Sequence, residues 1–170
     1  IISKLASEKI LHIDASRLKS GGGVLHLIKL LELEKYSNFH KIIVYTYQNS
    51  EFEKFKSHKI IIKTHAYINK NIFYQIFWQR FLLKKQISSD HLLFTIDSTS
   101  FCEFKKNVVL NQDLIGFQGG SLNYFSFKNK VVSFVKYLVA KKAIKNSIAN
   151  IFTTKYALDE VFKKIGTIKN

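Results

Sequence analysis

Short apolar runs alternate along the chain with longer segments in which apolar residues recur at helical spacing. The short runs do not alternate cleanly with polar residues, a pattern typical of parallel strands that are buried on both faces of a sheet. They lie at 9–14, 41–47, 59–64, 91–96, 107–110 and 149–153. Each run therefore predicts a buried strand, and the segments between the runs supply the helices that cover the sheet.

The helical segments lie at 24–33, 72–86, 128–145 and 156–165. The second is predicted to be amphipathic, with Gln79 and Arg80 pointing away from its apolar side. That apolar side is formed by Phe73, Ile76, Phe77, Phe81 and Leu82, with Trp78 beside them. Gly166 follows the last segment and is expected to end its helix as a C-cap.

This order of strands and helices predicts an α/β fold: a Rossmann-like, mostly parallel sheet with helices on both faces. At 170 residues we expect one domain covering 1–170, because a chain of this length can bury a single core. No internal repeat, low-complexity tract or linker divides the sequence. It begins with Ile1 and contains no methionine, so we expect a fragment of a longer protein.

The net charge of +15 would ordinarily indicate a nucleic acid or an anionic membrane as partner. However, only Arg17 and Arg80 among the 27 basic residues are arginine, whereas base reading and phosphate clamping rely heavily on arginine. The bias toward Lys, Ile, Asn, Phe and Tyr also matches an AT-rich coding sequence. The charge therefore leaves two interpretations open, codon bias or an anionic partner, and we expect no nucleic acid.

Cysteine and histidine usage excludes several classes of site. The single cysteine, Cys102, rules out an internal disulfide, and it has no recognisable base partner in the sequence. The six histidines show no metal-ligand spacing, so no metal is expected.

No apolar run approaches the roughly 20 residues that span a bilayer. We expect a cytoplasmic protein, with peripheral attachment to the inner face of the membrane left open.

A glycine loop follows the first predicted strand. Gly21, Gly22 and Gly23 stand where a helix begins, so a phosphate or sugar could approach the backbone closely. Alternatively, the three glycines only permit a tight turn. The spacing matches neither the dinucleotide-binding pattern G-x-G-x-x-G nor a P-loop.

Three segments resemble family 4 glycosyltransferases of the GT-B fold. The segment ILHIDASRLKSGGGVLHLIKLLE (10–32) is similar to the opening of these enzymes, where a glycine-rich loop follows the first strand. VVLNQDLIGF (108–117) is similar to a strand followed by Gln-Asn and Leu-Pro-Phe, with Asp113 and Gly116 in place of the Asn and the Pro. NIFTTKYALDEVFKKIG (150–166) resembles the last strand and helix of the family's first domain.

The resemblance implies the amino-terminal, acceptor-side domain of a retaining glycosyltransferase of the hexosyltransferase type. Such enzymes transfer a sugar from a nucleotide-sugar donor to a polysaccharide or glycolipid acceptor in cell-envelope biosynthesis. The nucleotide-sugar is then a substrate, and no cofactor is expected. The resemblance places the donor-binding carboxyl-terminal domain, with its pair of glutamates, outside these 170 residues, so we expect the fragment alone to be inactive, and its catalytic residues are unknown.

The resemblance also assigns candidate contacts. Gly21, Gly22 and Gly23 would touch the phosphate or sugar of the donor, and Gln112 and Asp113 would touch the donor sugar or an acceptor hydroxyl. Polar loop residues can equally cap a turn or face solvent. For Asp14, His26 and the turn at 97–99, structural roles are the favoured interpretation.

The helix at 128–145 carries lysines beside Val131, Phe134, Val135 and Leu138, a pattern that can lie on an anionic membrane. Lys136, Lys141 and Lys145 are the candidate membrane-facing residues. The alternative is a helix whose apolar stripe packs on the sheet while its lysines are solvated. As a whole, the chain could therefore be half of a sugar transferase, or a basic α/β module that binds nucleic acid or anionic membrane without catalysis.

Overall fold

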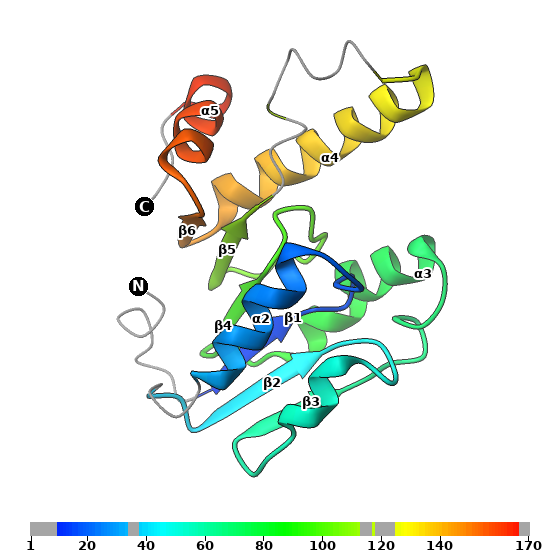
Figure 1. The fold of residues 1–170 in the computed structure, drawn as a ribbon, viewed down its shortest axis with the longest axis vertical. Helices are drawn as coiled ribbons and strands as arrows, with labels where there is room; N and C mark the ends of the chain where they lie inside the picture. The colour runs from blue at the N-terminus through cyan, green and yellow to red at the C-terminus, as the bar shows by residue number, and fades with distance from the viewer. Residues whose placement is uncertain (1–9, 34–37, 113–116, 118–124, 167–170) are drawn as a thin grey trace.

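The computed structural model describes residues 10–33, 38–112, 117 and 125–166, in which six parallel strands form one sheet (Figure 1). The strands are β1 (Ile10–Asp14), β2 (Lys41–Tyr45), β3 (Ile60–Lys63), β4 (Leu92–Thr95), β5 (Asn107–Asn111) and β6 (Ala149–Phe152). All six predicted strands are confirmed to within two residues at each end.

The strand order is β3-β2-β1-β4-β5-β6, which makes the fold Rossmann-like. The chain moves outward from β1 to β3, then returns to the other side of β1 and continues outward from β4 to β6. The direction of travel thus reverses between β1 and β4. In open parallel sheets, ligands bind at the carboxyl ends of the strands beside such a reversal.

Both faces of the sheet are buried, as the apolar runs predicted. In β2, Ile42 and Val44 pack into one apolar cluster, and Ile43 and Tyr45 pack into a second. The alternation follows from the period of two in a strand, which sends successive side chains to opposite faces. Helix α2 (Gly22–Glu32) covers the first face, and Trp78 belongs to the cluster on the second.

The second face is covered by α3 (Ile72–Phe77), a π-helical turn η3 (Trp78–Leu82) and a 3₁₀ turn η4 (Leu83–Gln86). Another 3₁₀ turn, η2 (Glu51–Phe55), precedes β3.

The long helix α4 (Phe127–Asn146) and α5 (Lys155–Ile165) pack together near β6 (Figure 1). Gly166, with φ 80°, ends α5 as predicted. Within the described residues no helix is both long enough and apolar enough to cross a bilayer.

The prediction for the buried side of 72–86 was wrong. Phe73 is 78% exposed, and Phe77 and Phe81 are also exposed, whereas Gln75 and Gln79 are buried. Both glutamines are buried because hydrogen-bond acceptors in the core accept from their side-chain amide groups. Gln75 Nε2 donates to the carbonyls of residues 68 and 70, and Gln79 Nε2 donates to Asp14. Apolar spacing cannot detect such partners, which are distant in sequence.

A buried polar chain crosses the second face. His12 Nδ1 lies 3.0 Å from Tyr45 Oη, and His12 Nε2 lies 2.9 Å from His91 Nδ1. Burial, followed by the charges of His91 and Lys63, lowers the pKa of His12 to about 4. His12 is therefore neutral at pH 7 and serves to satisfy polar groups within the core.

Candidate functional site

The candidate site lies at the carboxyl edge of the sheet, where the strand order reverses. β1 ends at Asp14 and β4 ends at Thr95, and the two residues are register partners. β5 ends beside them at Asn111, and α2 begins at Gly22. The candidate residues predicted from the sequence lie in the segments that follow β1, β4 and β5.

The glycine loop leaves the amino terminus of α2 open. Gly21 is the N-cap, with φ 88° and ψ −166°, a conformation that only glycine adopts readily. No side chain caps the helix, so its first amides are available to a ligand. A Cβ added at Gly21 or Gly22 would meet no atom within 4 Å. The loop therefore presents accessible amides and the positive end of the helix dipole, which favour phosphate.

Gly23 is the point at which the glycine loop touches the end of β5. A Cβ built on Gly23 would lie 3.4 Å from Gln112 Oε1 and 3.6 Å from Ile96 Cγ2. It would also lie 2.9 Å from Leu18 Cδ2, so a larger residue would displace its neighbours. If the resemblance to family 4 glycosyltransferases holds, the loops at 20–23, 96–99 and 111–117 are expected to meet at one edge of the sheet. For the described residues of these loops they do, since Gly23 lies beside both Gln112 and Ile96.

Two polar groups in these loops are buried without a hydrogen-bond partner in the described structure, Gln112 Nε2 and Ser98 Oγ. A buried amide or hydroxyl without a partner costs roughly 1–3 kcal/mol, and such groups concentrate where a ligand or water completes them. Gln112 lies at this edge with a buried, unpartnered amide nitrogen, and its contact with a substrate stays a prediction. Asp113, the other residue predicted for this loop, lies outside the described residues.

Asp14 organises the loops behind this edge. Its Oδ1 accepts hydrogen bonds from the backbone N–H and the hydroxyl of Ser16, and its Oδ2 accepts from Gln79 Nε2 and Ser100 Oγ. These contacts join the loop after β1, the η3 turn and the connection after β4. The structural role favoured for Asp14 agrees with this arrangement. Gln79 was missed as a supporting residue because helical spacing placed it on the solvent side.

The turn after β4 is held by its own side chains and by Arg17. Asp97 Oδ1 accepts from the Thr99 amide at 2.9 Å, and Arg17 Nη1 donates to the Thr99 carbonyl at 3.0 Å. This agrees with the expected turn at 97–99. His26 lies on the surface, with its Nδ1 2.7 Å from the Gly22 carbonyl oxygen, which agrees with the structural role favoured for it.

A basic hollow of about 380 Å³ adjoins the glycine loop. Its lining contains three cationic side chains, those of Arg17, Lys19 and Lys70, and no carboxylate. Ser20, Asn71 and Gln75 add polar atoms, and Ile72 completes the lining. The hollow therefore suits an anionic group held next to the amides of the loop.

We expect Gly21→Ala to lower the free energy of unfolding by about 1–3 kcal/mol, because alanine is strained at the backbone angles of Gly21. Gly22→Ala is the matched control. It adds the same methyl group at the next residue, where φ is not positive and the space is open, so we expect no loss of stability. Urea denaturation followed by circular dichroism compares the two variants. Equal destabilisation would contradict the assigned loop conformation.

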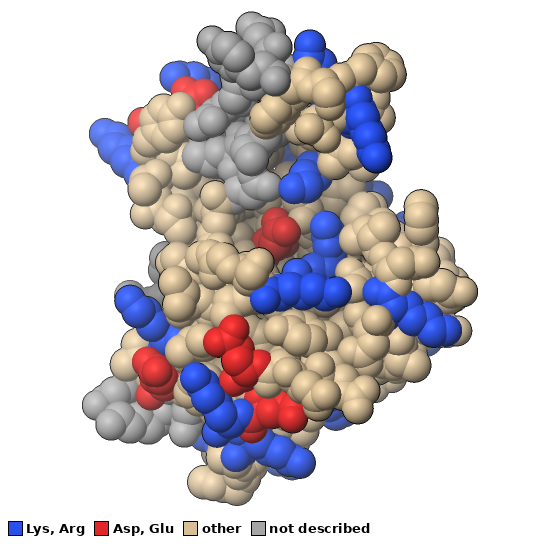
Figure 2. Space-filling model, turned by 45° about the vertical axis from the view of Figure 1, so that its right-hand side comes forward, with Lys and Arg blue, Asp and Glu red and all other residues tan. Residues whose placement is uncertain are grey.

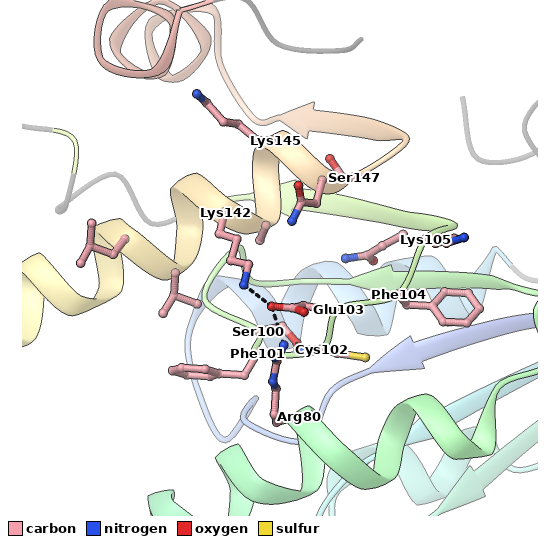
Figure 3. A pocket seen from close by; sticks show the side chains of 15 residues that line it. Arg80, Ser100, Phe101, Cys102, Glu103, Phe104, Lys105, Lys142, Lys145 and Ser147 are labelled. Carbon is pink, nitrogen blue, oxygen red and sulfur yellow. Dashed lines mark hydrogen bonds and ion pairs between the residues drawn. The ribbon is translucent and has the colours of Figure 1, made fainter.

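A larger cavity of about 650 Å³, here called the groove, is lined by the segment 100–107 and by the second half of α4, with Arg80 contributed by η3 (Figure 3). At its centre Glu103 pairs with Arg80 on one wall and with Lys142 on the other. Hydrogen bonds from Arg80 and Lys142 lower the pKa of Glu103 to about 2. Basic side chains gather around a hollow on this side of the molecule (Figure 2). Sequence reasoning missed the groove because Arg80, Glu103 and Lys142, which pair at its centre, are far apart along the chain.

The interpretation in which the apolar stripe of α4 packs on the sheet is wrong. Val131, Phe134, Val135 and Leu138 are all exposed. Helix α4 instead buries Ala140 and Ile144, which pack in a cluster with residues of α5. Of the three lysines predicted to face a membrane, Lys145 is exposed and lines the groove. Lys136 and Lys141 are half-buried, and Lys141 Nζ lies 5.7 Å from the centre of the Tyr137 ring.

Other chemistry is not indicated within the described residues. Burial, with a further contribution from Asp14, raises the pKa of the Cys102 thiol, so Cys102 is a poor nucleophile. No group of three or more His, Cys, Asp and Glu residues there could hold a metal ion.

Comparisons of the chain with protein-family models, with curated proteins and with solved structures found no match. The fold class therefore rests on the strand order and the parallel pairing, and the site rests on its geometry. What the molecule itself establishes is a single α/β domain with a six-stranded parallel, Rossmann-like sheet.

Proposed function

We propose that this chain is the amino-terminal, acceptor-side half of a GT-B glycosyltransferase. The enzyme would transfer a sugar from a nucleotide-sugar to a polysaccharide or glycolipid acceptor in cell-envelope biosynthesis. The observation that carries the proposal is the contact between Gly23 and Gln112 at the reversal of strand order. It joins two of the three segments that resemble family 4 glycosyltransferases, at the edge where parallel sheets bind ligands.

The glycine loop is assigned to the donor. Accessible amides at the start of α2 suit a phosphate oxygen, and the three cations of the adjoining hollow favour the negative charge of a nucleotide diphosphate. Gln112, whose buried Nε2 has no hydrogen-bond partner among the described residues, is assigned to a hydroxyl of the donor sugar or the acceptor. These residues bind and orient substrates, and the second domain would supply the nucleotide pocket and its pair of glutamates.

The test places a negative charge at the loop without disturbing the fold. Gly22→Asp is tolerated sterically because an added Cβ meets nothing within 4 Å, and an acidic residue in the first turn of a helix is favourable. The new carboxylate competes with phosphate for the amides of the loop. We expect kcat/KM for sugar transfer by the full-length protein to fall about tenfold or more, measured as nucleotide released from a panel of nucleotide-sugars.

Ser89→Asp is the charge-matched control. Ser89 is exposed in the turn before β4, at the opposite edge of the sheet, so this variant should retain full activity. Absence of transfer and of binding with every nucleotide-sugar would overturn the proposal. It would leave the alternative, a basic α/β module without catalysis.

A further inference from the structure

We propose that the groove is a binding site for a soluble organic phosphate, whose phosphate group takes the place between Arg80 and Lys142 that the Glu103 carboxylate now occupies. This inference does not depend on the proposed sugar transfer. Among the described residues, the groove and the basic hollow beside the glycine loop have no lining residue in common. The groove is therefore a second site, and the inference rests on its position, its charge and its mixed lining.

The groove lies against the second face of the sheet. Cys102 and Phe104 line it and belong to the apolar cluster on that face. The segment 100–107 leads from the end of β4 back to the start of the parallel strand β5, so it crosses this face from the carboxyl edge to the amino edge. The glycine loop begins α2, which covers the first face. A molecule in the groove thus lies on the side of the sheet opposite to α2.

The charge of the groove favours an anion that carries more than one negative charge. Its described lining contains one carboxylate, that of Glu103, and four cations, Arg80, Lys105, Lys142 and Lys145. Arg80 and Lys142 reach Glu103 from opposite sides, whereas Lys145 points away from it (Figure 3). Glu103 is ionised at pH 7, because hydrogen bonds from Arg80 and Lys142 lower its pKa to about 2. With Glu103 in place, these side chains still leave an excess of positive charge.

A phosphate group suits the position between the two cations better than a carboxylate does. A phosphate monoester carries a charge of about −1.5 to −2 at pH 7 and three acceptor oxygens, whereas a carboxylate carries one charge. The planar guanidinium of Arg80 and the ammonium of Lys142 are both favourable partners for phosphate. The side chains of Arg80, Glu103 and Lys142 are 40%, 41% and 61% exposed, so Glu103 can turn into solvent as the phosphate enters.

The rest of the lining suits the organic part of such a ligand. Its apolar side chains are those of Phe101, Phe104, Leu138, Val139 and Ala143. Polar groups adjoin them at the amino edge, where Asn107 begins β5 and Ser147 follows α4. The volume of about 650 Å³ falls within the roughly 300–1,000 Å³ of small-molecule sites. Among the exposed apolar residues described on α4, only Leu138 lines the groove, so its apolar surface is a local patch that fits a small ligand.

The test measures binding of phenyl phosphate to the 170-residue chain by isothermal titration calorimetry, with benzoate as the matched ligand. Both compounds join a benzene ring to an acidic group, but benzoate carries one negative charge only. We expect phenyl phosphate to bind, and benzoate to bind about tenfold more weakly or less. Amide NMR shifts locate the site, and we expect phenyl phosphate to shift residues of 100–107 and 138–147.

Two substitutions with opposite expected signs test the position of the phosphate group. Lys142→Gln removes one of its two cations and should weaken binding about tenfold, as the loss of a hydrogen bond from a charged donor does. Glu103→Gln removes the competing carboxylate and should strengthen binding severalfold. Both residues are exposed, so the variants should fold, and circular dichroism checks this.

Two controls separate the groove from general basicity and from the glycine loop. Lys164→Gln makes the same charge change at an exposed position of α5, and we expect it to change the affinity less than about twofold because screening weakens distant exposed charges. Gly22→Asp places a carboxylate at the glycine loop. We expect the NMR shifts within 100–107 and 138–147 to persist in this variant.

Several results would overturn the proposal. These are no binding of phenyl phosphate, equal binding of benzoate, or weaker binding by Glu103→Gln. Equal losses for Lys142→Gln and Lys164→Gln would also overturn it, because affinity would then follow net charge and not the groove. NMR shifts that are confined to the glycine loop and the hollow, and are lost in Gly22→Asp, would assign the phosphate to the proposed donor site instead.

Discussion

Replacing Trp78 by alanine is expected to lower the free energy of unfolding by about 3–5 kcal/mol, the usual cost of removing a large aromatic side chain from a packed core. Trp78 is 1% exposed, and its ring centre lies 5.5 Å from that of Tyr45 and 6.2 Å from that of His65. Chemical denaturation followed by circular dichroism measures the change. Fluorescence is unsuitable because Trp78 is the only tryptophan.

Phe73→Ala is the matched control, since Phe73 belongs to the same helical segment but is 78% exposed. We expect a change within about 0.5 kcal/mol, as for most surface substitutions. The pair tests which side of 72–86 is buried. A large loss for Phe73→Ala with a small loss for Trp78→Ala would show that the segment buries the side predicted from apolar spacing.

Replacing Asp14 by alanine is expected to lower the free energy of unfolding by about 3 kcal/mol. The substitution removes the acceptor for Ser16, Gln79 and Ser100, all of which are buried. Each buried donor left without a partner costs roughly 1–3 kcal/mol, and part of that cost is offset because a buried polar carboxyl group is also removed. Urea denaturation measures the loss.

Asp159→Ala removes the same side chain from an exposed position on α5 and should change stability by less than about 0.5 kcal/mol. Asp14→Asn keeps the shape of the side chain and one acceptor oxygen. Its NH₂ group replaces the other oxygen and would face one of the donors that now bond to Asp14. We expect an intermediate loss. Full stability of Asp14→Ala would show that the hydrogen bonds around Asp14 do not hold the loops of the carboxyl edge together.

The sheet was predictable because its signal is local. In the run 41–47, consecutive apolar residues can all be buried only in a strand covered on both faces, and the helical segments between the runs supply the cover. The glycine loop was predictable for a similar reason. Three adjacent glycines at the start of a helix indicate special backbone geometry, and Gly21 has it.

The surroundings of the site were less predictable. Apolar spacing assigned Gln79 to solvent, but Asp14 lies 65 positions away in sequence and accepts its amide hydrogen at 2.8 Å. The groove depends in the same way on Glu103, which meets Arg80 and Lys142 only in the folded chain. A buried polar group and a charged cavity both depend on partners that local periodicity does not contain.

By itself, the sequence determined the strands, the helices, their order and the parallel sheet, because backbone propensity and the burial period act over a few neighbouring residues. It also indicated which loops would meet, since the carboxyl ends of parallel strands share one edge. Only the tertiary structure decided which face of each helix is buried, that Gln112 lies against Gly23, and that the apolar stripe of α4 stays exposed. The reason is that packing contacts and hydrogen bonds join residues that are distant in sequence. At these positions the free energy of the tertiary contacts outweighs the preference set by the local hydrophobic pattern.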